Sequence, residues 1–233
     1  MEQKFRKATC WNCHKEFTFN QKEWGKISNP HYCPQCVEIV KKEEIEEKRK
    51  QNEEHIKYLI AKLPRLYQNI TTNKDYKRYI EKSLYITGDV GTGKTVLVVT
   101  LAKHYIINNI PIKWISYPEF IMMLQNAFKN DAYKNAGTSW TTKINPYNEA
   151  EEVAEFEGYL FIDDLGAEKL TDFVRQITYF IINHREQNML KTVITSNFSL
   201  QEVDAQIDRR ISSRIAGICE VLKLKGQDKR LKV

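Results

Sequence analysis

The sequence lacks any apolar run that approaches the roughly 18 residues a helix needs to cross a membrane. It also lacks an apolar secretory signal after the opening residues Met1 to Lys4. We therefore expect a cytoplasmic protein with no membrane partner. Its net charge of +6 at pH 7 is a mild excess, which permits contact with nucleic acid but does not require it.

Cysteine is also scarce, with five residues in 233, but four of the five form two pairs. Cys10 and Cys13 make one C-x2-C knuckle, and Cys33 and Cys36 make a second, with 19 residues between the pairs. Cytoplasmic thiols stay reduced, so this spacing predicts a four-thiolate zinc ribbon over residues 1–37. A segment this short cannot bury enough surface to fold alone, and zinc is expected to supply the missing folding free energy.

Other interpretations of these cysteines are weaker. His14 completes a C-x-x-C-H haem-attachment string, but that chemistry belongs outside the cytosol and leaves the second pair unexplained. Disulfide pairing is disfavoured by the same compartment. His14 or His31 could replace a sulfur, although four cysteines already saturate the site. The fifth cysteine, Cys219, lies in an apolar stretch and is predicted to be a buried core residue.

Residues 38–63 are rich in charges of both signs and are predicted to form a helical linker. Glu44 and Lys48, for example, have the i,i+4 spacing that stabilises an isolated helix. Contact with nucleic acid is conceivable, but mixed charges favour a solvated connecting helix. Pro64 ends this helix, so the third and largest part of the chain is expected over residues 64–233.

A glycine-rich loop joins a short apolar run, residues 84–86, to a helical pattern over residues 96–107. In this context the pattern G-x-x-x-x-G-K-[ST] indicates a nucleotide-binding P-loop. Its glycines let successive N–H groups point at one phosphate; Lys94 should reach the β- and γ-phosphates of ATP, and Thr95 should hold Mg²⁺. The alternative, a turn that binds nothing, is disfavoured because every fixed position is filled. The predicted ATP-binding residues are Gly88, Asp89, Val90, Gly91, Thr92, Gly93, Lys94 and Thr95.

Residues 159–164 form a second anchor, an apolar run that ends in two carboxylates. The apolar run predicts a buried central strand, and the carboxyl end of such a strand is where an open parallel sheet binds its ligand. Asp163 is expected to hold Mg²⁺ through water, and Asp164 to polarise the attacking water. The alternative is a strand-terminating turn with solvated acids, which the accompanying P-loop disfavours.

Further strands are predicted at residues 112–116, 192–197 and about 220–222. Their alternation with helical patterns predicts an α/β fold with a parallel sheet flanked by helices. Asn197, at the end of one of these strands, would lie beside the γ-phosphate and could orient the lytic water. A strand that ends in Ser-Asn is common, however, and carries little weight alone.

The stretch from 128 to 146 has a weak pattern in which aromatic residues alternate with lysines. Such residues can stack on the bases of single-stranded DNA and neutralise its phosphates. An ordinary polar insertion is at least as good an interpretation. The residues concerned are Lys129, Tyr133, Lys134, Trp140 and Lys143.

The P-loop, the apolar-Asp-Asp strand, the strand ending in Thr-Ser-Asn and a downstream Ser-Arg together resemble AAA+ ATPases. The combination is more narrowly similar to the DnaC/DnaI helicase-loader group, over about residues 63–231. The segments that carry the narrower resemblance are Leu63-Pro64-Arg65-Leu66-Tyr67, Ile162-Asp163-Asp164-Leu165-Gly166-Ala167-Glu168, Thr195-Ser196-Asn197, Ser213-Arg214 and Gly226-Gln227-Asp228-Lys229-Arg230.

The resemblance implies a five-stranded parallel sheet in the order 5-1-4-3-2 and no C-terminal lid. It implies an ATPase that assembles into a ring or spiral and loads a replicative hexameric helicase onto single-stranded DNA. It also implies a sensor at Asn197, an arginine finger at Arg214 directed at a neighbouring subunit's ATP, and a sensor-2-like contact from Arg230. Loaders of the DnaI type carry an N-terminal zinc module that contacts the helicase, which is the role implied for the four paired cysteines.

The sequence departs from the AAA+ pattern at two points. Asp164 stands where many AAA+ proteins have glutamate, and its shorter side chain is expected to place the attacking water less well. The chain also ends where most AAA+ relatives carry a helical lid, as loaders of this group do, which leaves Arg230 without a lid to carry it. Both departures favour a slow, assembly-stimulated ATPase that acts as a timer.

Two further functions stay open beside the helicase loader. One is an IstB-like transposition ATPase that acts on duplex DNA with a transposase, which the zinc ribbon disfavours. The other is a nucleotide-dependent DNA-binding adaptor with negligible turnover. Asp164, which stands where many AAA+ proteins have glutamate, is the residue that points to this function. Without the family resemblance, Arg214 would be interpreted as a surface arginine in a salt bridge.

Overall fold

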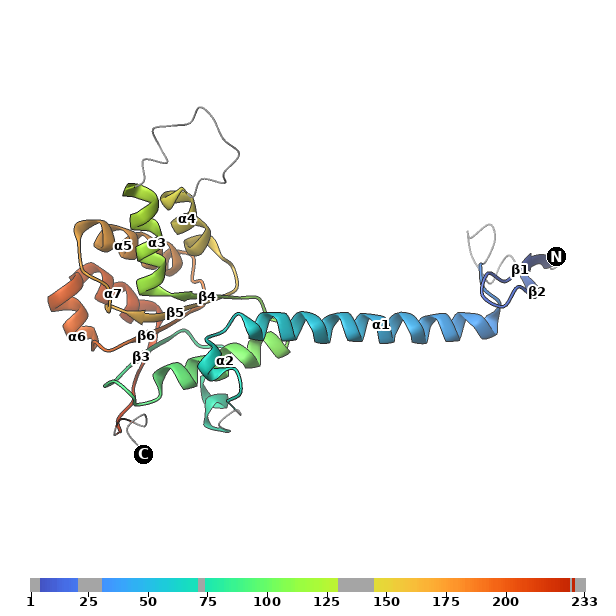
Figure 1. Cartoon of the computed structure of the whole chain (residues 1–233), viewed down its shortest axis with the longest axis horizontal. Helices are drawn as coiled ribbons and strands as arrows, with labels where there is room; N and C mark the ends of the chain where they lie inside the picture. The colour runs from blue at the N-terminus through green and yellow to red at the C-terminus, as the bar shows by residue number, and fades with distance from the viewer. Residues whose placement is uncertain (1–4, 21–30, 71–73, 130–144, 227, 229–233) are drawn as a thin grey trace, which may run out of the picture. The chain divides into compact units, whose positions relative to one another are not determined.

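The computed structural model describes residues 5–20, 31–70, 74–129, 145–226 and 228 (Figure 1). The chain divides into two compact units, Met1–Tyr58 and Leu59–Val233, which are described separately. None of the helices in the described ranges is both long enough and apolar enough to span a membrane.

The first unit contains an antiparallel hairpin and a long helix. The hairpin pairs β1 (Phe5–Thr9) with β2 (Glu16–Asn20), in the register that sets Ala8 opposite Phe17. The helix α1 (Pro34–Ala61) begins directly after Cys33. The predicted boundary at residues 37 and 38 therefore falls inside a helix, because the second cysteine knuckle is itself the start of α1.

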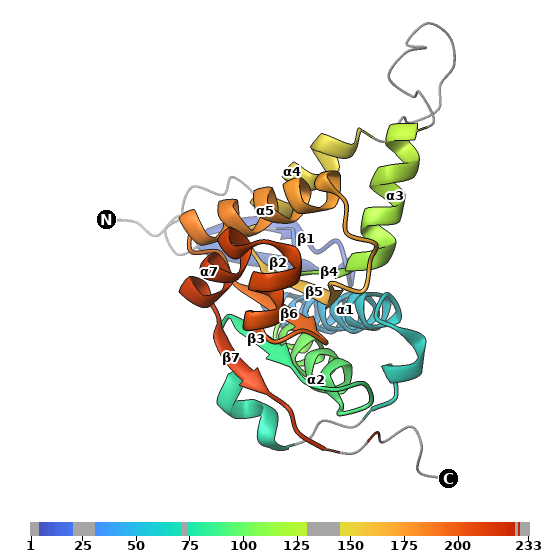
Figure 2. The same cartoon turned by 90° about the vertical axis from the view of Figure 1, so that its left-hand side faces the viewer.

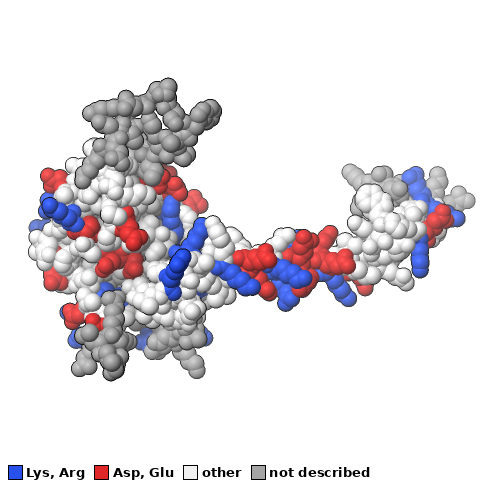
Figure 3. Space-filling view, in the orientation of Figure 1, with Lys and Arg blue, Asp and Glu red and all other residues white. Residues whose placement is uncertain are grey.

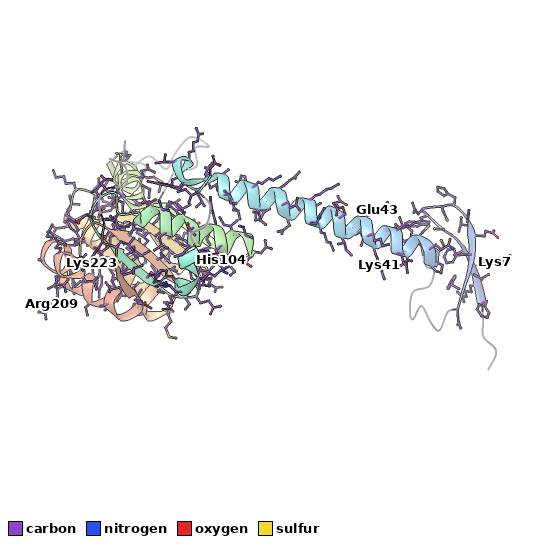
Figure 4. The ribbon with its side chains drawn as sticks, turned by 90° about the horizontal axis from the view of Figure 1, so that it is seen from below. Lys7, Lys41, Glu43, His104, Arg209 and Lys223 are labelled. Atoms are coloured by element: carbon purple, nitrogen blue, oxygen red, sulfur yellow. The ribbon has the colours of Figure 1, made fainter. Side chains whose placement is uncertain are left out.

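The surface of α1 carries side chains of both charges along its length (Figure 3). Figure 4 shows two of them, Lys41 and Glu43, and both are exposed. Arg49 Nη2 lies 2.7 Å from Glu46 Oε1, one turn earlier. Exposed pairs of this kind contribute at most about 1 kcal/mol each, so the helix is a solvated one, as its mixed charges indicate.

The second unit is built on five parallel strands in the order β4-β5-β6-β3-β7. Numbered within this unit, the order is 5-1-4-3-2, which confirms the predicted sheet. The central strands β3 and β6 are buried along their whole length, as expected for strands covered on both faces. The strand bounds are β3 Leu84–Thr87, β4 Ile112–Ser116, β5 Tyr159–Leu165, β6 Thr192–Ser196 and β7 Glu220–Lys223.

Helices cover both faces of this sheet (Figures 1 and 2). On one face lies α2 (Lys94–Ile107), and on the other lie α3 (Tyr117–Lys129), α4 (Pro146–Glu155), α5 (Asp172–Gln187) and α7 (Arg209–Ile218). Short helical turns connect these elements: η1 (Arg65–Tyr67), η2 (Lys74–Tyr79), α6 (Leu200–Glu202) and the π-helical η3 (Val203–Ile207). The unit is thus a three-layer α/β fold, and this part of the prediction is confirmed.

The helix α5 shows how local sequence sets these elements. Thr171 caps its first turn, since its Oγ1 accepts from the Val174 N–H at 3.3 Å. Ile177 and Ile181 are buried as the helical periodicity predicts, but Phe180 is 41% exposed. Cys219 is buried, as predicted.

The largest fully buried side chain in the described parts of the chain is an arginine, Arg185 of α5. Its Nε donates to Thr192 Oγ1 at 2.8 Å, and the terminal nitrogens donate only to main-chain carbonyls. Burial lowers the pKa of the guanidinium to about 10. The cation is stabilised by carbonyl dipoles from the end of α4, the approach to β5 and the start of β6; these acceptors belong to Val153, Ala154, Phe156, Gly158 and Lys191.

Candidate functional site

The P-loop connects β3 to α2, and its tight turn depends on backbone conformations that favour glycine. Gly91 and Gly93 have φ angles of 78° and 98°, a region that other residues rarely adopt. A side chain on Gly91 would also overlap the carboxylate of Asp228. The segment after β7 runs beside the loop, since the Leu224 N–H donates to Thr87 O at 2.7 Å. The loop is therefore held in a tight curl by its own glycines and by the chain that passes it.

Lys94 begins α2 and is only 8% exposed. Its Nζ donates to Gly88 O at 2.7 Å, to Asp89 O at 3.1 Å and to Asn197 Oδ1 at 2.7 Å. The P-loop and the end of β6, which are far apart in the sequence, thus meet at one ammonium group. Asn197 stands beside the predicted phosphate-binding lysine, where its expected sensor role would require it.

The two carboxylates at the end of β5 have different surroundings. Asp163 Oδ1 accepts from Thr195 Oγ1 at 2.6 Å, and Thr195 Oγ1 in turn accepts from the Asp164 N–H at 2.8 Å. Burial raises the pKa of Asp163, and the nearby Asp164 charge raises it further, whereas hydrogen bonds from Thr195 and Thr95 lower it. The hydroxyl of Thr95 therefore lies beside the carboxylate of Asp163. Thr95 and Asp163 are the two residues expected to hold Mg²⁺.

Asp164 has a left-handed backbone, with φ at 66°. The pairing of β5 with β6 shifts register between Ile162 and Leu165, so the extra residue bends the strand at the carboxylates. Asn197 Nδ2 lies 3.4 Å from Asp164 Oδ1. The bulge thus turns Asp164 toward Asn197. No local sequence signal announces this irregularity.

These residues line one pocket of about 420 Å³. The P-loop, α2, β5 and β6 form one side of it, and the segment before the first core strand forms another, through Pro64, Leu66 and Tyr67. Sequence reasoning named this segment only as part of a family resemblance and did not place it at the ligand. The lining residues are Pro64, Leu66, Tyr67, Val90, Gly91, Gly93, Lys94, Thr95, Val96, Asp163, Asp164, Thr195 and Asn197.

Arg214 of α7 is not among the described residues that line this pocket. Its Nη1 donates to Glu186 Oε2 at 2.6 Å and its Nη2 to Tyr179 OH at 3.1 Å. Within a single chain, Arg214 therefore forms a salt bridge on the surface of α5. Tyr133, Lys134, Trp140, Lys143 and Arg230 lie outside the described residues, as does the side chain of Lys129.

The four paired cysteines of the first unit converge on one point. Their Sγ atoms all lie within 4.8 Å of one another, and Cys13 Sγ is 3.9 Å from Cys33 Sγ. Zinc–sulfur bonds of about 2.3 Å separate tetrahedral sulfurs by about 3.8 Å, so the cluster fits this ion. Neither His14 nor His31 belongs to the cluster in the described residues. Four converging thiols suggest zinc and argue against haem attachment, which would use one pair alone.

Comparison with known proteins supports the interpretation of the second unit as an ATP-binding domain. The replicative helicase loader DnaI of Bacillus subtilis (strain 168) is 25% identical over 162 residues, which are 64% of this chain and 48% of that protein. The match thus spans about half the length of that relative.

Solved structures show the same fold at lower identity. A crystal structure of DnaI matches with a TM-score of 0.54 and 20% identity, over 71% of this chain and 93% of that one. The DnaC helicase loader matches with a TM-score of 0.51 and 24% identity, over 70% and 100%. AMPPCP-bound DnaA from Aquifex aeolicus matches with a TM-score of 0.54 and 16% identity, over 72% and 52%.

A protein-family model describes most of the chain. The model of IstB-like ATP binding proteins matches residues 48–233, a range that contains the P-loop, both strand-end carboxylates and Asn197. Because this match covers well over half of the sequence, the chain belongs to the family of IstB-like ATP binding proteins.

Proposed function

We propose that the protein is an ATPase that loads a replicative hexameric helicase onto single-stranded DNA. The observation that carries the ATPase part is the convergence of Lys94, Asn197 and Asp164 in one pocket. The loader part is supported by the similarity to a replicative helicase loader, together with a cysteine cluster outside the ATP-binding core.

The side chains of the pocket divide the chemistry between them. Lys94 and the P-loop N–H groups bind the β- and γ-phosphates, while Thr95 and Asp163 would hold Mg²⁺. Mg²⁺, when bound, neutralises charge that develops on the phosphates. Asp164 accepts a proton from the attacking water, and Asn197, 3.4 Å from Asp164 Oδ1, orients that water. The short side chain of Asp164 makes this a slow ATPase.

Arg214 would complete the site of a neighbouring subunit in a ring or spiral. In one chain its guanidinium is bound to Glu186 and Tyr179, so assembly must exchange these partners for the γ-phosphate of the neighbour. An arginine supplied in this way is worth about 10³–10⁵ in rate. Hydrolysis should therefore depend on protein concentration and on single-stranded DNA, which gathers the subunits.

Arg214→Ala should leave ATP affinity unchanged and remove the stimulated part of hydrolysis, because the residue lies outside the pocket of its own chain. Phosphate release is measured at rising protein concentration, with and without single-stranded DNA. Arg210→Ala is the matched control: Arg210 also lies over Tyr179, at 4.8 Å, but pairs with Asp208. Stimulation that survives in the Arg214 variant, or is equally lost in the control, contradicts the assignment.

The helicase should bind the first unit, which carries the four paired cysteines. Trp11 sits between two cluster cysteines and is 64% exposed, and large exposed aromatic residues often dominate protein interfaces. We expect Trp11→Ala in the full chain to weaken co-elution with a hexameric helicase about tenfold or more. ATP binding should stay unchanged, and Phe5→Ala, with Phe5 61% exposed in β1, serves as the control. If the wild-type chain binds no replicative helicase, the loader function is wrong.

The family match favours a second candidate, a transposition ATPase that acts on duplex DNA with a transposase. ATP-dependent filaments on duplex DNA, without helicase binding, would support it. A DNA-binding adaptor with negligible turnover differs from both, since phosphate release would stay at background even when the protein is assembled on DNA.

A further inference from the structure

The helix α2 carries a second buried lysine beyond Lys94. Lys103 is 7% exposed, and its Nζ donates to Gln68 O at 2.5 Å and to Ile70 O at 3.0 Å. Burial lowers the pKa of this ammonium group. The next residue of α2, His104, is labelled in Figure 4 and shows where Lys103 lies along the helix. Among the described residues, the acceptors of Lys103 are these two main-chain carbonyls.

Both carbonyls belong to a short segment that is hydrogen-bonded into one piece. The Tyr67 N–H donates to Pro64 O at 2.9 Å, and the Ile70 N–H donates to Tyr67 O at 3.2 Å. Gln68 Nε2 binds the carbonyls of residues 61 and 63, at 3.0 and 2.7 Å. A contact with Gln68 or Ile70 is therefore transmitted along the whole segment from residue 61 to residue 70.

The same segment supplies an apolar wall of the ATP pocket. We call this surface, formed by Pro64, Leu66 and Tyr67, the base wall. Pro64, Leu66 and Tyr67 line the pocket together with residues of the P-loop. Leu66 is 79% exposed, so its packing within the chain does little to hold it in place. Leu63 is 3% exposed and anchors the start of the segment. A second attachment of the segment to the core is the pair of bonds from Lys103.

We propose that Lys103 is a positioning residue for the base end of the nucleotide. It fixes the segment from 64 to 70 at the distance from the P-loop at which Pro64, Leu66 and Tyr67 enclose the purine. One helix then sets both ends of the ligand, because α2 binds the phosphates through Lys94 and holds the base wall through Lys103. The inference rests on the proposed ATP binding and adds the group that sets affinity for the base.

Two ligands separate this role from a purely structural one. ATP contacts the phosphate loop and the apolar wall, whereas inorganic tripolyphosphate contacts the phosphate loop alone. A loosened wall weakens binding of the first ligand and spares the second. General destabilisation of the core weakens both in proportion.

The test is calorimetric titration of the full chain with Mg²⁺ and either ligand, at a temperature where circular dichroism shows each variant folded. Lys103→Met keeps the aliphatic stem and removes the donors; we expect a Kd for ATP about tenfold higher and a Kd for tripolyphosphate within about twofold of wild type. Leu66→Ser alters the wall itself at an exposed position and should reproduce this pattern even if Lys103→Met does not fold. Lys191→Met is the matched control, since Lys191 Nζ donates to Glu81 O at 2.7 Å away from the pocket.

The possible outcomes separate the role of Lys103 from the proposed ATP binding on which it depends. Equal losses for both ligands, or an unchanged Kd for ATP in folded Lys103→Met, overturn the role of Lys103 while ATP binding stands. An unchanged Kd for ATP in Leu66→Ser overturns the base wall. A wild-type chain that binds neither ligand overturns the proposed function, and the inference with it.

Discussion

Lys94→Ala should abolish ATP binding at ordinary concentrations, raising the Kd on the order of 100- to 1,000-fold, or about 3–4 kcal/mol. The ammonium group is 8% exposed and lies among P-loop carbonyls and Asn197. The phosphates of ATP would be left without the cation that faces them in this weakly hydrated position. Calorimetric titration with Mg²⁺–ATP measures the loss.

The control for this variant is Lys82→Ala, which removes a lysine that pairs with Glu220 outside the pocket. Its ATP affinity should match that of the wild type. Thermal unfolding without nucleotide shows whether the Lys94 variant is folded. A folded Lys94 variant that binds ATP as tightly as the control would show that the pocket at the P-loop is not the nucleotide site.

Removal of zinc by a chelator should unfold the hairpin of the first unit and leave the second unit intact. The cysteine cluster is the main buried centre of the described hairpin region, and structural zinc contributes about 10–16 kcal/mol to folding. The second unit has its own apolar core between the sheet and its helices. Loss of dispersed amide signals from β1 and β2 but not from β3 to β7, in nuclear magnetic resonance of the full chain, measures the effect.

Two cysteine variants make this test specific to the cluster. Cys36→Ser should lower zinc content measured by mass spectrometry and loosen the hairpin. Cys219→Ala removes a buried thiol that lies outside the cluster and should keep full zinc content. If the protein purifies without bound metal, or if the hairpin signals survive chelation, zinc does not hold this unit together.

The fold was largely predictable because its signals are local. The P-loop glycines, the apolar runs of the strands and the alternation with helices each occupy a few adjacent residues. Lys94, Asp163 and Asn197 could be placed at one edge of the sheet, since the carboxyl ends of parallel strands meet there. The register between β5 and β6, which brings Thr195 to Asp163, depends on pairing across the sheet and left no trace in either strand alone.

The base wall and the surroundings of Arg214 were beyond sequence reasoning for a different reason. Pro64, Leu66 and Tyr67 have no chemical signature, and their place at the pocket follows from a hydrogen bond made by Lys103, 35 residues from Gln68. The partners of Arg214 on α5, Tyr179 and Glu186, come from a helix packed against α7. The sequence of α7 records a basic cluster but not the acid that faces it.

The buried guanidinium of Arg185 limits how the second unit can move. The carboxyl end of α4 cannot peel away without removing three of the carbonyl acceptors of this buried cation, which is costly. Any movement of α4 that keeps these bonds must carry α5 with it, so we expect the two helices to move as one body.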